Sequence, residues 1–479
     1  MVRTLTIDNF KGFNQETIID FSELTLLSGL NSSGKSSAYQ ALIALSQSLQ
    51  DVQITEKSKL PIFCTYGNKL KLGTIEDIIN DLSRPMKLQL DFDKMHVYYS
   101  YQVIENHIIL TEVAVENFSE EDPYFYRLKF DLESKKIKVD AENCLRFVDY
   151  EMDSIIGKYL QTEKIVEDAQ QQFYSSIVCF DSVYGTVFSR NQLRFFNVDF
   201  QQVINCIEPS LRSKINNLHF TKHLEEQFLK LEKQEASLYV SGMGLRTEFL
   251  ELNYVPPYRG IPQRYYDVAE GEDGGVNGEL LSAINTNRKI PYRFQKNNKK
   301  IFGDSLVALN YWTKEILGID GIEQDSKLEG VISSLMILQD GKKYSINMVG
   351  YGVSQALPII LNILFSDSQL CIIDEPEIHL HPKAQVQFAK FFYEMARLGK
   401  QIIVETHSEY IINYLIYESL ISTSNSIVKM YWVKKGETGS FIDLIRWDKF
   451  GFIKNRPKGF SDGMEDIVKK MIDFRTQVK

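Results

Sequence analysis

The sequence predicts an α/β fold in which a parallel sheet core adjoins an antiparallel β lobe, with a helical insertion between the two halves of the chain. Three observations predict this fold. A glycine-rich loop at 29–37 lies between an apolar run and a helix-like segment. Successive β-like runs separated by polar turns occupy 85–140, and helix and strand patterns alternate over 354–446.

The glycine-rich loop fits the phosphate-loop pattern G-x-x-x-x-G-K-[ST] at every required position. An apolar run at 24–27 precedes it and helically spaced apolar residues at 38–45 follow it, which is the strand–loop–helix context that the pattern requires. The alternative is a chance match in a turn rich in serine and glycine. The residues expected to bind a nucleotide are Gly29, Asn31, Ser32, Ser33, Gly34, Lys35, Ser36 and Ser37.

The chemistry of this loop follows from its backbone and two side chains. Gly29 and Gly34 allow the main chain to curl so that successive N–H groups point at phosphate oxygens. The N-terminus of the following helix adds positive potential. Lys35 is expected to reach the β- and γ-phosphates, and the Ser36 hydroxyl is expected to ligate Mg²⁺.

Length and composition indicate a soluble, globular chain with several lobes. Its 479 residues are too many for one core. We expect an N-terminal lobe at 1–150, a helical insertion at 151–250 and a C-terminal lobe at 251–479. The chain is 44% hydrophobic and 24% charged, as globular proteins are. Its net charge of −9 argues against a broadly basic nucleic-acid-binding surface, although a local basic groove stays open.

Cysteine usage and the N-terminal segment predict a cytoplasmic protein. The five cysteines are scattered and form no C-x-x-C pair, which is typical of a reduced chain. The first ten residues alternate like a strand and contain no apolar signal-peptide region. No apolar run is long enough to span a bilayer, so we expect no membrane partner.

The remaining elements follow from local patterns. Leu5 and Ile7 alternate with polar residues, which indicates an edge strand, and 18–21 supply its partner. The runs over 85–140 predict an antiparallel meander, 150–250 has helical periodicity, and proline and glycine over 254–280 predict a loop. Further helices are expected at 304–318, 354–365, 383–397 and 408–420, and strands at 329–348, 370–373 and 401–405.

An acidic pair and a histidine follow two of these strands. The apolar strand at 370–373 runs directly into Asp374 and Glu375. Asp374 is expected to hold Mg²⁺ and Glu375 to polarise the attacking water. Alone, the pair is an ordinary acidic turn, but beside a phosphate loop the nucleotide-site interpretation is favoured. His407, after the next strand, is expected to reach the γ-phosphate, against the alternative of a structural histidine.

Three motifs together carry a family resemblance. The phosphate loop, Asp-Glu-Pro-Glu-Ile-His-Leu-His-Pro at 374–382 and Glu-Thr-His-Ser at 405–408 resemble an ATP-binding-cassette (ABC) type ATPase of the SMC/RecF/OLD group. The Glu-Pro-Glu-x-His-Leu-His-Pro form is typical of OLD-like AAA ATPases in antiphage defence operons. Residues 349–358 stand where this group has its signature motif, and 451–460 resemble its N-x-P-x-G-F ending.

The resemblance implies an ABC-type P-loop ATPase head that uses ATP and Mg²⁺. In this group, two heads enclose two ATP molecules, each bound by the phosphate loop of one head and the signature of the other. The resemblance implies catalytic roles for Lys35, Glu375 and His407, with Ser36 and Asp374 at Mg²⁺. The residues expected to contact the γ-phosphate across the dimer are Gly350, Gly352, Ser354 and Gln355, with Ser354 as the signature serine.

Two histidines and two arginines also stand out in the sequence. His379 and His381 offer only two nitrogen atoms without other nearby ligands, so we expect a turn after the acidic strand and not a zinc site. Arg259 and Arg264 belong to a Pro-x-x-Arg loop that the group also contains, but their spacing assigns them no role.

The leading function hypothesis is a slow ATPase that forms a homodimer or higher homo-oligomer through its heads and controls a separate effector. OLD-type nucleases append a metal-binding Toprim domain, whereas about seventy residues follow His407. Related antiphage systems pair the ATPase with an HNH nuclease or a Toprim effector, so a nuclease partner is expected, with nucleic acid bound directly or through that partner. The alternative is a RecF- or SMC-like DNA-binding clamp in repair or recombination. A membrane-transporter ATPase is disfavoured, because the segment at 349–358 lacks the Leu-Ser-Gly-Gly signature sequence of transporters.

Overall fold

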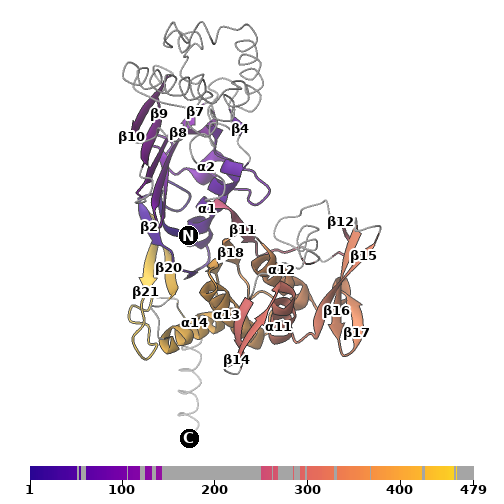
Figure 1. Cartoon of the computed structure of the whole chain (residues 1–479). Helices are drawn as coiled ribbons and strands as arrows, with labels where there is room; N and C mark the ends of the chain where they lie inside the picture. The colour runs from indigo at the N-terminus through magenta and orange to yellow at the C-terminus, as the bar shows by residue number, and fades with distance from the viewer. Residues whose placement is uncertain are drawn as a thin grey trace, which may run out of the picture.

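The computed structural model of the chain describes residues 1–50, 53–54, 61–104, 106–118, 124–131, 136–142, 250–260, 263–267, 284, 292–296, 299–327, 332–366, 368–422, 427–457 and 460. In these residues an antiparallel sheet, a buried helix, a central sheet and a group of helices pack on one another in that order (Figure 1). The α/β fold with a parallel core and an antiparallel β lobe is thereby confirmed.

The central sheet has six strands. In spatial order they are β11 (Leu252–Val255), β18 (Leu370–Asp374), β19 (Gln401–Glu405), β3 (Leu24–Gly29), β20 (Val428–Gly436) and β21 (Gly439–Ile445). The first five run parallel, and β21 pairs antiparallel with β20. Because parallel strands end at the same edge of a sheet, the segments after β3, β18 and β19 emerge together.

Each face of the central sheet belongs to a different apolar core. Leu26 and Ile373 pack in a core with four helices, whereas their sequence neighbours Leu27 and Ile372 pack in a core with the antiparallel sheet and α1 (Lys35–Gln50). This alternation explains why the strands are apolar throughout. The four helices are α11 (Ser305–Leu317), α12 (Tyr351–Phe365), α13 (Pro382–Arg397) and α14 (Glu409–Ile421).

These helices agree with the expected ranges to within a few residues, because their ends carry recognisable caps. The Asp304 carboxylate accepts a hydrogen bond from the Val307 N–H, and the Ser408 hydroxyl accepts one from the Ile411 N–H. Gly318, with φ of 71°, ends α11 in the left-handed conformation. No helix in the described ranges is both long and apolar enough to cross a membrane.

The antiparallel sheet confirms the meander predicted over 85–140. Seven of its nine strands lie side by side. They are β10 (Lys136–Glu142), β9 (Tyr124–Asp131), β8 (His107–Asn117), β7 (Met95–Ile104), β6 (Met86–Phe92), β1 (Val2–Asp8) and β2 (Thr17–Asp20). The short strands β4 (Gln53–Ile54) and β5 (Pro61–Ile62) join beside β8.

Two expectations about strands are wrong. β1 is not an edge strand, because it pairs with both β2 and β6, and β2 forms the edge. The alternation of buried Leu5 and Ile7 with polar residues marks one apolar face of the sheet and carries no information about its neighbours. The loop expected from 254 begins later, since Tyr254 and Val255 belong to β11.

Smaller elements complete the described part of the chain. They are α2 (Ile75–Ile78), β12 (Tyr266–Asp267), the hairpin β13 (Tyr292–Lys296) and β14 (Lys299–Gly303), β15 (Gly321–Lys327), β16 (Ile332–Gln339), β17 (Lys342–Ser345) and the 3-10 turn Ile346–Met348. The helical insertion expected at 151–250 lies outside the described residues except for Leu250. The three domain boundaries stay a prediction.

The turn of the β20–β21 hairpin is docked between the N-terminal segment and the phosphate loop. The Ser440 N–H donates a hydrogen bond of 2.6 Å to the Gly12 carbonyl oxygen. A methyl group added to either Gly12 or Gly34 would lie 2.3 Å from the Ser440 hydroxyl oxygen. Position 34 therefore needs glycine for both its φ of 97° and the close approach of the hairpin, whereas a methyl group at Gly12 would require the Ser440 side chain to shift.

Gly12→Ala should lower the midpoint of thermal unfolding, with a loss of about 1–3 kcal/mol in the free energy of unfolding, because its methyl group overlaps the Ser440 hydroxyl. Circular dichroism measures the shift. The double variant Gly12→Ala/Ser440→Gly removes the overlapping atom and should recover most of the loss. An equal loss in the single and double variants would contradict this packing explanation.

Candidate active site

Three strand ends bring most of the predicted site residues to one edge of the central sheet. β3 leads into the phosphate loop, β18 ends at Asp374 and β19 ends at Glu405. Asp374 lies opposite Glu405 in the β18–β19 pair, and Glu405 lies opposite Leu27 in the β19–β3 pair. The ends of β3, β18 and β19, which are far apart in the sequence, therefore lie side by side at this edge.

The phosphate loop has the curled backbone that its glycines were expected to allow. Gly29 has φ of 153°, Gly34 has φ of 97° and Ser32 has φ of 61°. A methyl group at position 29 would also lie 2.2 Å from the Val433 carbonyl oxygen. Glycine at 29 is thus required by both conformation and space. Asn31 and Ser32 are exposed at the tip of the loop.

A cavity of about 620 Å³ lies against the second half of this loop, at Gly34, Lys35, Ser36 and Ser37. Its volume is in the range of small-ligand sites. Three other segments line it and were not identified from the sequence. They contribute Lys11, Gly12, Asn14, Asp77, Asn80, Lys435, Gly436, Glu437, Gly439 and Ser440. Glycines at 12, 436 and 439 are the sequence feature that could have pointed to these segments. Without the fold, glycines indicate only turns.

A second cavity, of about 380 Å³, lies on the other side of the loop. Its lining includes Leu30, Asn31, His407, Trp432 and Phe460. Phe460 belongs to the N-x-P-x-G-F ending, and its ring lies 5.4 Å from the Trp432 ring. The ending motif therefore reaches the same edge of the sheet as the phosphate loop.

Lys35 and Ser36 both contact Glu405. The Lys35 Nζ atom donates to the Leu30 carbonyl oxygen at 2.9 Å and lies 3.7 Å from Glu405 Oε1. The Ser36 hydroxyl donates to Glu405 Oε2 at 2.8 Å. The sequence placed Glu405 in a motif but assigned it no role, and only the pairing of β19 with β3 reveals these contacts.

Asp374 is held by two tyrosines. The Tyr39 hydroxyl donates to Asp374 Oδ2 at 2.5 Å, and the Tyr254 hydroxyl lies 3.4 Å from the same oxygen. Burial, together with the neighbouring Glu405 carboxylate, raises the pKa of Asp374 to about 7. Asp374 is the residue predicted to hold Mg²⁺, and its Oδ2 atom is already in a hydrogen bond with Tyr39.

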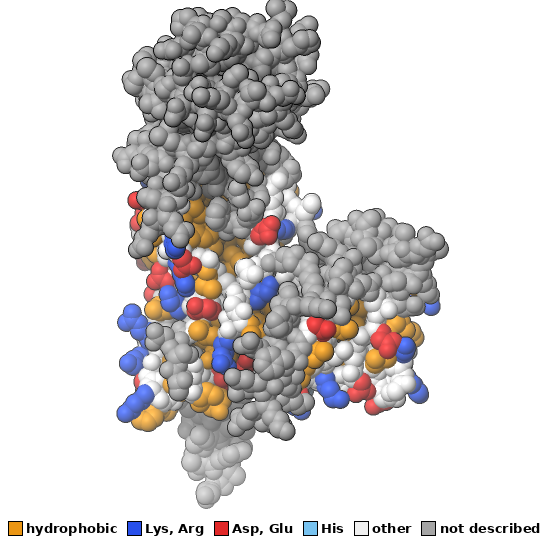
Figure 2. Space-filling view, viewed as in Figure 1, with side chains coloured by type: hydrophobic (Ala, Val, Ile, Leu, Met, Phe, Trp, Pro, Cys, Tyr) orange, Lys and Arg blue, Asp and Glu red, His pale blue; other side chains and the backbone are white. Residues whose placement is uncertain are grey.

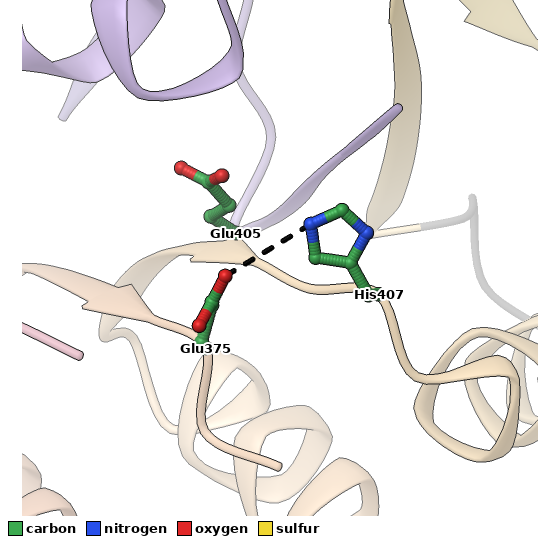
Figure 3. Close-up of side chains that lie close together, drawn as sticks. All are labelled: Glu375, Glu405 and His407. Atoms are coloured by element: carbon green, nitrogen blue, oxygen red, sulfur yellow. Dashed lines mark ion pairs between the residues drawn. The ribbon is translucent and has the colours of Figure 1, made fainter. Parts of the chain in front are cut away.

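Glu375 and His407 face each other across the ends of β18 and β19, with the Glu405 carboxylate beside them (Figure 3). The His407 Nε2 atom lies 3.9 Å from Glu375 Oε1. Glu375 has φ of 44°, and its N–H donates to the Glu405 carbonyl oxygen at 2.9 Å. Burial and the nearby Lys35 ammonium lower the pKa of His407, so its imidazole is neutral near pH 7.

Glu377 fixes the turn that carries His407. Its carboxylate accepts hydrogen bonds from the His407 N–H at 2.5 Å and the Thr406 hydroxyl at 2.9 Å. Burial raises the pKa of Glu377. The first glutamate after the acidic pair therefore positions the histidine loop, a contact that sequence spacing could not show.

Arg259 lies under the acidic pair. One guanidinium nitrogen donates to the carbonyl oxygens of Asp374, at 2.5 Å, and Glu375, at 3.0 Å. The side chain is 4% exposed, and its Nε and Nη1 atoms have no hydrogen-bond partner within the described ranges. Burial lowers the pKa of Arg259 to about 10, although the Asp374, Glu377 and Glu375 carboxylates oppose this. Arg264, by contrast, is exposed.

The signature-like segment lines neither cavity. Gly350 is exposed at the N-terminal cap of α12. Gly352 packs against the turn after β18, where a methyl group would lie 2.8 Å from the His379 carbonyl oxygen. His379 itself stacks edge-on against Tyr351, and His381 caps α13. Gly352, His379 and His381 therefore have packing or capping roles within this chain.

Ser354 and Gln355 are buried, and their side chains serve the same chain. The Ser354 hydroxyl donates to the Tyr351 carbonyl oxygen at 2.7 Å, and the Gln355 amide donates to the Gly260 carbonyl oxygen at 3.0 Å. Contact between either residue and a nucleotide bound to a second copy stays a prediction.

The residues at this edge suit a nucleotide phosphate and Mg²⁺. The Ser33 hydroxyl is buried and has no hydrogen-bond partner in the described part of the chain, so a phosphate oxygen would satisfy it. Ser36 and Asp374 offer the hard oxygen ligands that Mg²⁺ prefers. Bound there, Mg²⁺ would neutralise charge on a transferred phosphoryl group.

Comparison with known families finds one match that covers most of the chain. The family model described as "AAA ATPase domain" matches residues 1–412.

Two curated relatives align with shorter stretches. The energy-coupling factor transporter ATP-binding protein EcfA1 of Thermotoga maritima is 27% identical over 139 residues, which are 29% of this chain and 52% of that protein. EcfA of Methanococcus maripaludis is 24% identical over 180 residues, which are 37% of this chain and 62% of that protein. The chain thus spans 52–62% of the length of these relatives.

The solved structures that resemble the chain include SMC head domains. The head domain from Thermotoga maritima has a TM-score of 0.35 at 11% identity, covering 93% of this chain and 99% of the other. An SMC head domain derived from Pyrococcus furiosus, bound to the C-terminal domain of ScpA, has a TM-score of 0.38 at 13% identity, covering 99% of both chains.

Arg259→Gln should lower the rate of ATP hydrolysis about 10- to 100-fold with little change in nucleotide affinity, because Arg259 orients the backbone that carries Asp374 and Glu375. Steady-state phosphate release and equilibrium nucleotide binding separate the two effects. The matched control Arg264→Gln removes an exposed arginine from the same loop and should leave both values unchanged. Equal behaviour of the two variants would contradict the positioning role.

Proposed function

The chain belongs to the AAA ATPase domain family, and we propose that it is the ATP-hydrolysing subunit of an antiphage defence complex, which dimerises around ATP and controls a separate effector. The observation that carries the ATP-hydrolysing part of the proposal is the convergence of the phosphate loop with Asp374, Glu375 and His407 at one sheet edge. The two relatives are described as ATP-binding proteins, which supports ATP as the nucleotide.

In the proposed reaction, each side chain has one task. Lys35 and the N–H groups of the phosphate loop bind the phosphates, and Ser36 and Asp374 would hold Mg²⁺. The Glu375 carboxylate accepts the proton of the water that attacks the γ-phosphate, and ADP leaves with inorganic phosphate as the second product. The neutral imidazole of His407, 3.9 Å from Glu375, orients these groups.

Dimerisation is proposed because the site is open on one side. The side chains of Glu375 and His407 are 34% and 37% exposed, and Asn31 and Ser32 lie at the surface. A second copy would cover them. Beside Gly350, the apolar residues Met348 and Tyr351 are 76% and 45% exposed, which supports a contact surface at the start of α12. Hydrolysis is expected to be slow, because each site would be completed only in the dimer.

The defence role rests on the motif resemblance. The Glu-Pro-Glu-x-His-Leu-His-Pro form at 375–382 and the N-x-P-x-G-F ending are features of OLD-like ATPases in defence operons. The specific proposal is the ATPase subunit of a Septu-type system, whose effector is an HNH nuclease. The alternative is a RecF- or SMC-like DNA clamp. In Figure 2, lysine and arginine side chains are mixed with aspartate and glutamate on the visible described surface. The net charge of −9 favours the effector proposal over a broadly basic DNA-binding protein.

Glu375→Gln should reduce ATP turnover about 100-fold or more, because the amide cannot accept the proton of the attacking water. The variant should still bind ATP and accumulate as a dimer, measured by light scattering after size-exclusion chromatography. The control Lys35→Ala should abolish nucleotide binding and remain monomeric with ATP. Turnover at the wild-type rate in Glu375→Gln would exclude this residue as the general base.

Co-expression with the product of the adjacent open reading frame tests the effector proposal. The two proteins should co-purify, and ATP should change the activity of the partner. A partner that neither co-purifies nor responds to ATP would contradict effector control. The clamp alternative instead predicts that the isolated chain binds DNA only with ATP, with an affinity that falls steeply as salt increases.

A further inference from the structure

Glu405 occupies a fixed and buried position between the two halves of the candidate site. It is the last residue of β19, which lies between β18 and β3. Its carbonyl oxygen accepts the Glu375 N–H at 2.9 Å, and the next N–H, of Thr406, donates to the Leu27 carbonyl oxygen at 3.0 Å. The backbone on both sides of Glu405 is therefore held by the neighbouring strands, which fixes where its carboxylate lies.

That carboxylate contacts the two phosphate-loop side chains on which nucleotide binding is expected to depend. Glu405 Oε2 accepts the Ser36 hydroxyl at 2.8 Å, and Oε1 lies 3.7 Å from Lys35 Nζ. The side chains of Lys35 and Glu405 are each 5% exposed. One buried carboxylate thus holds both the lysine expected at the phosphates and the serine expected at the cation.

The negative charge at this edge of the sheet affects how a nucleotide can bind. Asp374, Glu375 and Glu405 already place three carboxylic acids at the edge, and Glu405 is one of the groups that raise the pKa of Asp374. A triphosphate adds further negative charge and draws Lys35 toward itself. A buried carboxylate that loses its cationic partner is strongly unfavourable, so nucleotide binding without a new positive charge is opposed.

A divalent cation can supply that charge. Ser36 is the predicted Mg²⁺ ligand and is hydrogen-bonded to Glu405, so a cation at Ser36 is adjacent to this carboxylate. We propose that Glu405 makes nucleotide binding conditional on the divalent cation, holding Lys35 and Ser36 in the empty site and opposing any nucleotide that arrives without Mg²⁺. This inference rests on the proposed function, because it takes ATP as the ligand.

Equilibrium binding of a fluorescent ATP analogue, in excess Mg²⁺ or in EDTA, tests the proposal without reference to turnover. The wild-type affinity should be about 100-fold weaker in EDTA, whereas Glu405→Gln should lose less than about 10-fold. The difference arises because the uncharged amide can still accept the Ser36 hydrogen bond but no longer repels the phosphates. The variant should therefore bind the analogue more tightly than the wild type in EDTA.

Two further variants keep the test decisive. Glu251→Gln removes an equal charge from an exposed position before β11, at the end of that strand away from Asp374, where it lines neither cavity, and should retain the wild-type Mg²⁺ dependence. Glu405→Asp keeps the charge and should retain most of that dependence, even where Glu405→Gln unfolds.

The outcomes separate this inference from the proposed function. Full Mg²⁺ dependence in a folded Glu405→Gln variant, equal effects of Glu405→Gln and Glu251→Gln, or loss of the dependence in Glu405→Asp would overturn the role of Glu405. Wild-type protein that binds no nucleotide even with Mg²⁺ would overturn the proposed function as well.

Discussion

The pairing of β19 with β3 on one side and β18 on the other is the constraint on which the candidate site depends. It places the end of β19 between the phosphate loop and the acidic pair, and parallel alignment directs all three ends to one edge. Glu405 stands at the centre of this edge, with its side chain on the phosphate loop and its carbonyl oxygen on the Glu375 N–H. A shift of one residue in either register would separate these groups.

The buried charges explain why several layers of the fold contribute to one site. Asp374 and Glu405 are nearly inaccessible, and buried carboxylates require hydrogen bonds or opposite charges. Lys35 and Tyr39 come from α1 or its start, Tyr254 comes from β11, and Arg259 comes from the loop after β11. Helix α1, the central sheet and the loop after β11 are thus tied together by the same acidic groups.

Much of the fold and site could be predicted because their signals are local. The phosphate loop and the strand ending at Asp374 are short segments, and their residue types are enough to predict their conformation and the chemistry expected of them. Helix ends were predictable for the same reason, since caps involve neighbouring residues. The wrong predictions concern contacts between segments far apart in the sequence. β1 pairs with β6, and the four residues before two prolines pair with β18 as the edge strand β11.

By itself, the sequence determined the fold class, and it predicted the chemistry of the phosphate loop and a site shared by that loop with Asp374, Glu375 and His407. Tertiary structure alone decided that Glu405 contacts Lys35 and Ser36, that Glu377 and Arg259 hold the acidic turn, and that the Ser440 hairpin packs on the phosphate loop. The physical reason is that a motif encodes groups within one turn of chain, whereas contacts between strand ends depend on strand order and register, which distant apolar faces set when they pack.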